Sequence, residues 1–156
     1  MDISFLSTKD NAESGQWFQF EGYGKKWPFD LKILGGDSDA VQKYNRKRLR
    51  SELFGKIQSG KFEEMTDDDY EAVDDLSDEA ILVRLVDIRG YKYAPEDKKH
   101  RVRIDYEPVV LFGRELKPKR EDFRYLIEQM PAVKDFVLKV SGERTNFLSE
   151  RKENLS

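Results

Sequence analysis

A run of acidic residues in the middle of the chain restricts its local structure more than any other feature of the sequence. Between Glu63 and Glu79 there are ten Asp or Glu residues and no Lys or Arg. Thr66 precedes three aspartates, an order typical of a helix N-cap followed by acids in the first turn. The apolar residues that follow fall on one helical face: Tyr70, Val73, Leu76, Ala80 and Val83. The sequence therefore predicts a helix from residue 67 to about residue 88, ending at Gly90.

A β-hairpin is predicted near the N-terminus. The stretch 28–34 places apolar side chains at alternate positions, which is the period of a half-buried strand. Gly22 and Gly24 supply a turn, so this stretch is expected to pair with residues 17–21. Residues 1–15 are expected to form a loose lead-in.

Three further helices are predicted from apolar residues spaced three to four positions apart. The first spans about 39–59, after a strand stop at residues 35–36. Its polar face carries five basic residues: Lys43, Arg46, Lys47, Arg48 and Arg50. The second helix begins at Pro118, and the third begins at Pro131 and runs towards Phe147.

These elements predict a chain that is mainly α with a small N-terminal β-hairpin (α+β), folded as one compact helical domain. The hairpin covers about 17–34, the helical body about 38–148, and a frayed tail 149–156. Within the body, residues 91–108 are expected to form a polar loop, in which Val102 and Ile104 are the candidates for a short strand. Residues 91–105 of this loop are basic.

The residue types restrict the chemistry. The chain has no cysteine, which excludes disulfides, thiolate metal sites and cysteine nucleophiles. It has a single histidine, His100. His100 lies in the basic loop, a poor setting for a general base. We therefore expect no enzymatic activity, no cofactor and no metal. One alternative is a metal-dependent hydrolase using the acids from Asp67 to Asp75. Against it, adjacent aspartates on a helix point in different directions, and the calcium-loop pattern is absent.

The charge balance bears on partners and location. Lys and Arg number 28 against 31 Asp and Glu, a net charge of −3, whereas nucleic-acid binders usually show a basic excess. Phosphate binding through Lys43–Arg50 and Lys98–Arg103 remains a lesser alternative. The sequence contains no run of about 20 apolar residues and no secretory signal pattern. We therefore expect a soluble cytoplasmic protein.

Several short motifs follow one another along the chain. The N-terminal ones are Gly15-Gln16-Trp17, then Ile33-Leu34-Gly35-Gly36-Asp37-Ser38, and then the helix through Tyr44 and Arg48. The C-terminal ones are Asp122, Phe123, Leu126, Ile127 and Pro131, then Val133, Phe136 and Val140, and finally Glu143-Arg144-Thr145-Asn146-Phe147. In this order the motifs resemble the tail assembly chaperones of long-tailed bacteriophages, over about residues 15–148. The chain departs from the family at 86–90, where a Trp-Glu-Gly-like stretch is common, and in the long basic loop 91–105.

This resemblance implies a non-enzymatic protein that binds the tape measure protein, keeps it soluble during tail assembly and recruits tail-tube subunits, in the host cytoplasm. An alternative is a structural tail-completion or connector subunit. Partner contacts are expected on the apolar edges of the helices and hairpin. The candidate contact residues are Trp17, Phe18, Tyr44, Phe123, Phe136 and Phe147.

Overall fold

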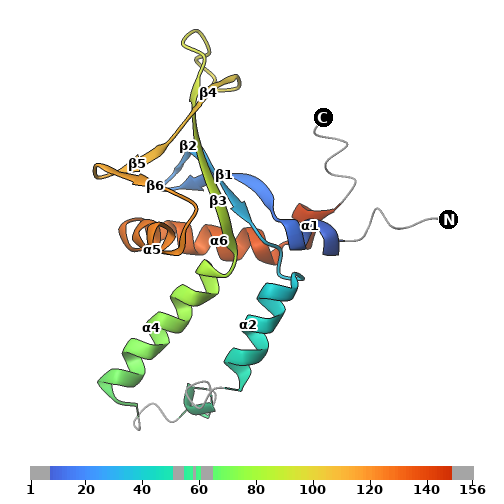
Figure 1. The fold of residues 1–156 in the computed structure, drawn as a ribbon, viewed down its shortest axis with the longest axis vertical. Coiled ribbons are helices and arrows are strands. Elements are labelled where there is room, and N and C mark those ends of the chain that lie inside the picture. The colour runs from blue at the N-terminus through green and yellow to red at the C-terminus, as the bar shows by residue number, and fades with distance from the viewer. Residues whose placement is uncertain (1–7, 51–54, 58, 61–64, 149–156) are drawn as a thin grey trace, which may run out of the picture.

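A computed structural model describes residues 8–50, 55–57, 59–60 and 65–148 of the chain. Figure 1 shows their arrangement. The helices are α1 (Lys9–Ser14), α2 (Asp39–Leu49), α4 (Asp67–Leu82), α5 (Arg120–Gln129) and α6 (Ala132–Gly142), followed by a 3₁₀ turn, Arg144–Phe147. The strands are β1 (Gln16–Gly22), β2 (Lys25–Ile33), β3 (Leu85–Tyr93), β4 (Arg103–Glu107), β5 (Val109–Leu111) and β6 (Arg114–Leu116). The predicted frayed tail, 149–156, lies outside the described residues.

The fold is a mixed α/β structure, so the prediction of a mainly α chain with a small hairpin is wrong. The structure is 46% helix and 27% strand. Four antiparallel strands form one sheet in the order β1-β2-β3-β4, and β5 and β6 form a separate two-stranded hairpin. The predicted N-terminal hairpin is present, but it makes up half of a larger sheet. The predicted helical body, 38–148, contains the other four strands.

The prediction fails most clearly at β3. The helix expected to reach about residue 88 ends at Leu82, and the chain then continues as a strand from Leu85 to Tyr93. This strand supplies the hydrogen-bonding partner that β2 lacks on its second edge. Gly90 fits the strand because a Cβ atom there would lie 2.7 Å from the carbonyl oxygen of Glu107 on β4.

Two other segments also differ from expectation. The loose lead-in contains helix α1, whose Ala12 is buried. The loop predicted over 91–108 holds the end of β3 and all of β4, so only residues 94–102 connect the two strands.

The core lies between one face of the sheet and helices α5 and α6, which lie together beside the sheet in Figure 1. Alternate residues of β2 point into it, namely Phe29, Leu31 and Ile33, as the period of two requires. The helices contribute buried side chains at helical spacing: Phe123, Leu126 and Ile127 from α5, and Val133, Val137 and Val140 from α6.

Helices α2 and α4 extend away from the sheet as two arms in Figure 1. The start of α4 follows the sequence prediction closely. The Thr66 hydroxyl accepts a hydrogen bond from the Asp69 N–H, and the Asp69 carboxylate accepts one from the Thr66 N–H, which together form a capping box. None of the described helices is both long enough and apolar enough to span a membrane.

Candidate partner-binding site

A groove of about 860 Å³ runs along the free edge of β1, between this strand and helix α6. No described strand pairs with the outer edge of β1, because β1 ends the sheet order. The strand side of the groove comprises Trp17, Phe18, Gln19, Glu21 and Gly22, together with Lys26 of β2. The helix side is one stripe of α6, at Ala132, Asp135, Phe136, Lys139, Val140 and Glu143, continued by Asn146. We call this the edge groove.

The two walls of the edge groove run antiparallel to each other. The Phe18 ring lies edge-on to Phe147, 5.8 Å between centroids, at the C-terminal end of the helical region. At the opposite end of the groove, the Ala132 N–H donates to the Tyr23 hydroxyl at 3.3 Å. The wall from residue 132 to 143 is about 17 Å long at the helical rise, and the strand from 17 to 22 spans about the same distance. The groove therefore matches about five residues of extended chain.

Three of the six predicted contact residues, Trp17, Phe18 and Phe136, meet at this groove although they come from distant parts of the sequence. All three are half-buried. The Phe136 ring also lies edge-on to the buried ring of Phe20 at 5.3 Å, which fixes it against the core. The groove thus combines aromatic surface with a rim carrying charges of both signs.

The other three predicted residues lie elsewhere. Phe123 is only 4% exposed and Phe147 only 1%, so both belong to the core. Tyr44 lies on α2, where its hydroxyl donates to the Leu76 carbonyl at 2.6 Å and ties the two arms together. Burial raises the pKa of the Tyr44 hydroxyl, so it remains a neutral donor at physiological pH.

The Trp17 ring is held by a network on the face of the sheet opposite α6. The Arg89 guanidinium lies 4.1 Å from the Trp17 ring centroid. The buried carboxylate of Asp30 accepts hydrogen bonds from Arg89 Nε at 3.0 Å and Arg103 Nη1 at 2.8 Å. This ion pair orients the guanidinium, and the guanidinium in turn supports the indole from the sheet side.

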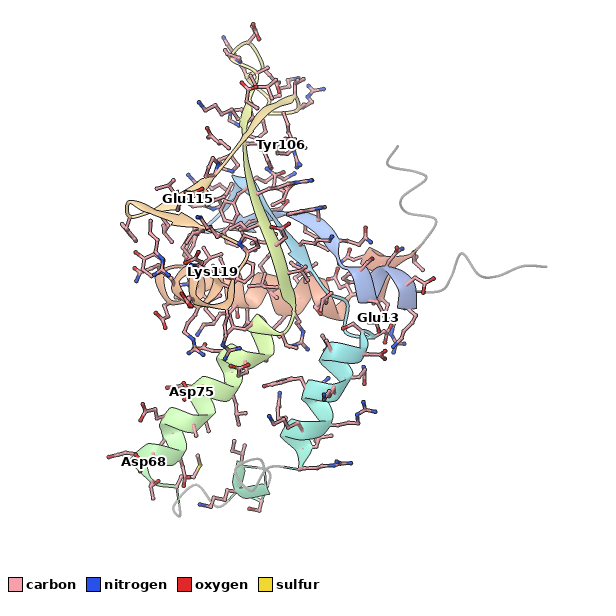
Figure 2. The ribbon with its side chains drawn as sticks, viewed as in Figure 1. Glu13, Asp68, Asp75, Tyr106, Glu115 and Lys119 are labelled. Atoms are coloured by element: carbon pink, nitrogen blue, oxygen red, sulfur yellow. The ribbon has the colours of Figure 1, made fainter. Side chains whose placement is uncertain are left out.

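The acidic and basic segments do not form a site within the part of the chain that the structure describes. No group of three His, Asp or Glu side chains there could hold a metal ion. Asp68 and Asp75 lie along α4, well away from the sheet (Figure 2). The basic segments 43–50 and 98–103 lie at opposite ends of the molecule in Figure 1. His100 is exposed and stacks on the Tyr93 ring at 4.5 Å.

A second, more apolar groove of about 240 Å³ lies between β2 and the β5–β6 hairpin, and we call it the hairpin groove. Its apolar lining comprises Trp27, Pro28, Phe29, Pro108, Val109, Val110, Leu111, Leu116, Leu126 and Met130. At the tip of the hairpin, next to this lining, Phe112 is 78% exposed, and Val110 is 60% exposed.

The backbone of Phe112 is unusual for an aromatic residue. Its φ of 50° and the Gly113 φ of 76° place both residues in the left-handed region, as a two-residue type I′ hairpin turn requires. The first position of this turn favours Asn or Gly. Most other residues, Phe included, lose about 1–2 kcal/mol in this left-handed conformation. Among the described residues, no aromatic ring packs against Phe112 to offset that cost.

The hairpin itself is fixed to the body by a buried carboxylate. Asp122 of α5 accepts hydrogen bonds from the Lys117 N–H at 2.8 Å and from Arg114 Nη2 at 2.6 Å. The Lys117 N–H, followed by the Arg114 guanidinium, lowers the pKa of the Asp122 carboxyl despite its burial. Arg114 directly follows the turn and Lys117 follows the end of β6, so Asp122 holds the hairpin both next to its tip and at its base.

The α6 wall of the edge groove and the β5–β6 hairpin were not predicted from the sequence. The α6 stripe facing β1 contains Ala132, Asp135 and Lys139, which sequence alone reads as an ordinary polar flank. The signal for the hairpin was weak, because only Val109–Leu111 is an apolar run and the second strand, Arg114–Leu116, has a single apolar residue.

Comparisons with protein families, curated proteins and solved structures returned no match for this chain.

Proposed function

We propose that the protein is a non-enzymatic tail assembly chaperone that acts in the host cytoplasm and binds extended segments of the tape measure protein in the edge groove. In this proposal it keeps that long partner soluble and recruits tail-tube subunits during assembly. The observation that carries the proposal is the edge groove, which places aromatic side chains from β1 and α6 beside a free strand edge. The motif resemblance supplies the identity of the partner.

A free strand edge suits a chaperone for a long chain. The outward-facing N–H and C=O groups of β1 can pair with the backbone of an added strand, and every partner sequence offers the same backbone groups. Phe18 and Phe136 offer aromatic surface on the α6 side of the sheet and Trp17 offers it on the other side, so side chains on both faces of that strand can be contacted. Recognition of this kind tolerates many sequences, so several copies can bind along one partner.

A chaperone must also keep its complex with the partner soluble, and the charge pattern of this protein suits that role. The groove rim carries Glu21, Lys26, Asp135, Lys139 and Glu143, and the chain as a whole has 38% charged residues. Because the rim carries charges of both signs, it favours neither acidic nor basic partner segments. Its charged side chains also stay in contact with water when the groove is occupied.

Co-expression with a tape-measure-type protein tests the proposal. The partner should move from the insoluble to the soluble fraction when this chain is present, and mass spectrometry should find the chain absent from purified particles. If the partner stays equally insoluble with or without this chain, the proposal is wrong. Stoichiometric presence in the particle would instead favour a structural tail-completion or connector subunit.

A further inference from the structure

We propose that the free protein self-associates through the β5–β6 hairpin, with Phe112 at the tip of one copy inserted into the hairpin groove of a second copy. This contact uses a different surface from the edge groove and does not depend on the proposed function. Figure 2 shows the hairpin projecting from the body, with Glu115 on its second strand.

Phe112 is poorly matched to its surroundings in the free protein. The side chain is held in a left-handed backbone conformation, is largely exposed and has no ring contact among the described residues. Burial of an exposed phenylalanine removes on the order of 150 Å² from water, which is a large favourable contribution for one side chain. The Asp122–Arg114 ion pair, two residues after Phe112, fixes the position of the tip that carries this ring.

The hairpin groove suits an apolar side chain of this size. Its walls are aliphatic and aromatic, with Trp27 and Met130 on the side of the protein body and Leu111 on the hairpin. The tip and the groove also lie next to each other on the same surface, because Leu111 lines the groove and Phe112 follows it. Two copies related by a two-fold axis can therefore exchange tips, so that each donates one Phe112 and accepts one.

The charged side chains around the proposed contact are complementary. Glu115 is the cross-strand neighbour of the exposed Val110 and has no ion-pair partner among the described residues. At the groove, Lys25 Nζ lies 3.9 Å from the Trp27 ring centroid and likewise pairs with no described carboxylate. Glu107 also lines the groove, but it pairs with Lys92 at 3.4 Å, which leaves Lys25, among the described residues, as the charge without an ion-pair partner beside the groove and Glu115 as the one beside the tip. This arrangement is complementary across a tip-to-groove contact.

The contact area indicates a weak dimer. Two exchanged phenylalanines with their flanking side chains bury on the order of 800 Å² in total, below the roughly 1,200 Å² of a stable interface. The dimer should therefore be concentration-dependent and reversible.

Sedimentation velocity over about 10 to 500 µM tests this directly. The wild-type sedimentation coefficient should rise with concentration, and Phe112→Asn should weaken the association at least tenfold. Asparagine suits the turn, so this variant is expected to fold, which thermal melting checks. Tyr70→Ala, which removes a similarly exposed ring from α4, is the control and should associate like wild type. A wild-type chain that remains monomeric over the whole range would overturn the proposal.

The absence of natural cysteine allows a second measurement of the same contact. Phe112→Cys and Met130→Cys are purified separately, mixed and oxidised mildly. Tip-to-groove exchange predicts that the mixed disulfide between the two variants exceeds its statistical share over the two homodisulfides. A statistical or smaller share would contradict this geometry even if a dimer forms.

Discussion

Asp30 and Arg89 face each other directly across β2 and β3, and the buried carboxylate accepts a hydrogen bond from Arg89 Nε at 3.0 Å. Arg103 of β4 donates to the same carboxylate oxygen. One acid thus joins three strands of the sheet and orients the guanidinium that supports Trp17 at the edge groove.

Replacing this acid should destabilise the sheet. Asp30→Ala leaves two guanidinium groups without their common acceptor, and we expect a loss of about 2–3 kcal/mol in the free energy of unfolding, measured by urea denaturation. Glu21→Ala removes a solvent-exposed partner of Lys26 and should cost less than about 1 kcal/mol. Equal losses in the two variants would contradict the structural role of Asp30.

Gly35 marks a close approach between α1 and the end of β2. A Cβ atom there would lie 2.6 Å from Ala12 Cβ and 3.2 Å from the Phe147 ring. Gly35→Ala should therefore destabilise the protein by about 1–3 kcal/mol through overpacking. Gly142→Ala, where a Cβ meets nothing within 4 Å, is the matched control and should be neutral or slightly stabilising in the same denaturation experiment.

The Asp122 carboxylate should make stability depend on pH in the acid range. Its folded-state pKa is lowered by the Lys117 N–H and the Arg114 guanidinium, so its stabilising effect is complete above the unfolded-state pKa. The effect is lost as the pH falls through the lower folded-state value. Asp122→Asn should melt below wild type at pH 7, and the gap should narrow from about pH 4 downward. A difference in melting temperature that stays constant down to pH 3 would show that the Asp122 carboxylate does not cause the pH dependence of stability.

The capping box of α4 is expected to contribute measurably. Thr66→Ala removes the acceptor for the Asp69 N–H and should cost about 1 kcal/mol. Lys119 is the N-cap of α5 and makes no side-chain capping bond, so Lys119→Ala should have a much smaller effect on the unfolding midpoint. If the two alanine variants shift the midpoint equally, the side-chain cap at Thr66 contributes nothing.

Local signals in the sequence predicted the elements that depend on neighbouring residues. The Thr66 cap, the N-terminal hairpin and the start of the last helix near Pro131 are all present, because capping and turn preferences act over a few residues. Strand β3 was missed because its alternation is broken. Val86 is an extra residue opposite the Lys32–Ile33 step of β2, and this bulge interrupts the period of two that identifies a strand.

The edge groove could not be predicted from local patterns for a different reason. Its walls are separated by more than 100 residues, and they meet only because β1 ends the sheet order and α6 packs against it. The sequence indicated that Trp17 and Phe136 are suited to contacts, but not that both line one groove, Trp17 from the far face of the sheet and Phe136 from α6. Phe123 and Phe147 carried the same signal and are buried, since hydrophobicity alone does not separate core from contact.

The central claim is that the edge groove binds the partner, and the two tryptophans allow a matched test of it. Each indole is half-buried beside a cation, but Trp17 lines the edge groove and Trp27 lines the hairpin groove. The decisive measurement is the calorimetric affinity of a soluble tape-measure-protein segment for the two alanine variants, each confirmed as folded by circular dichroism. We predict that Trp17→Ala weakens binding at least tenfold, while Trp27→Ala stays within about threefold of wild type. Unchanged binding by folded Trp17→Ala would contradict the account.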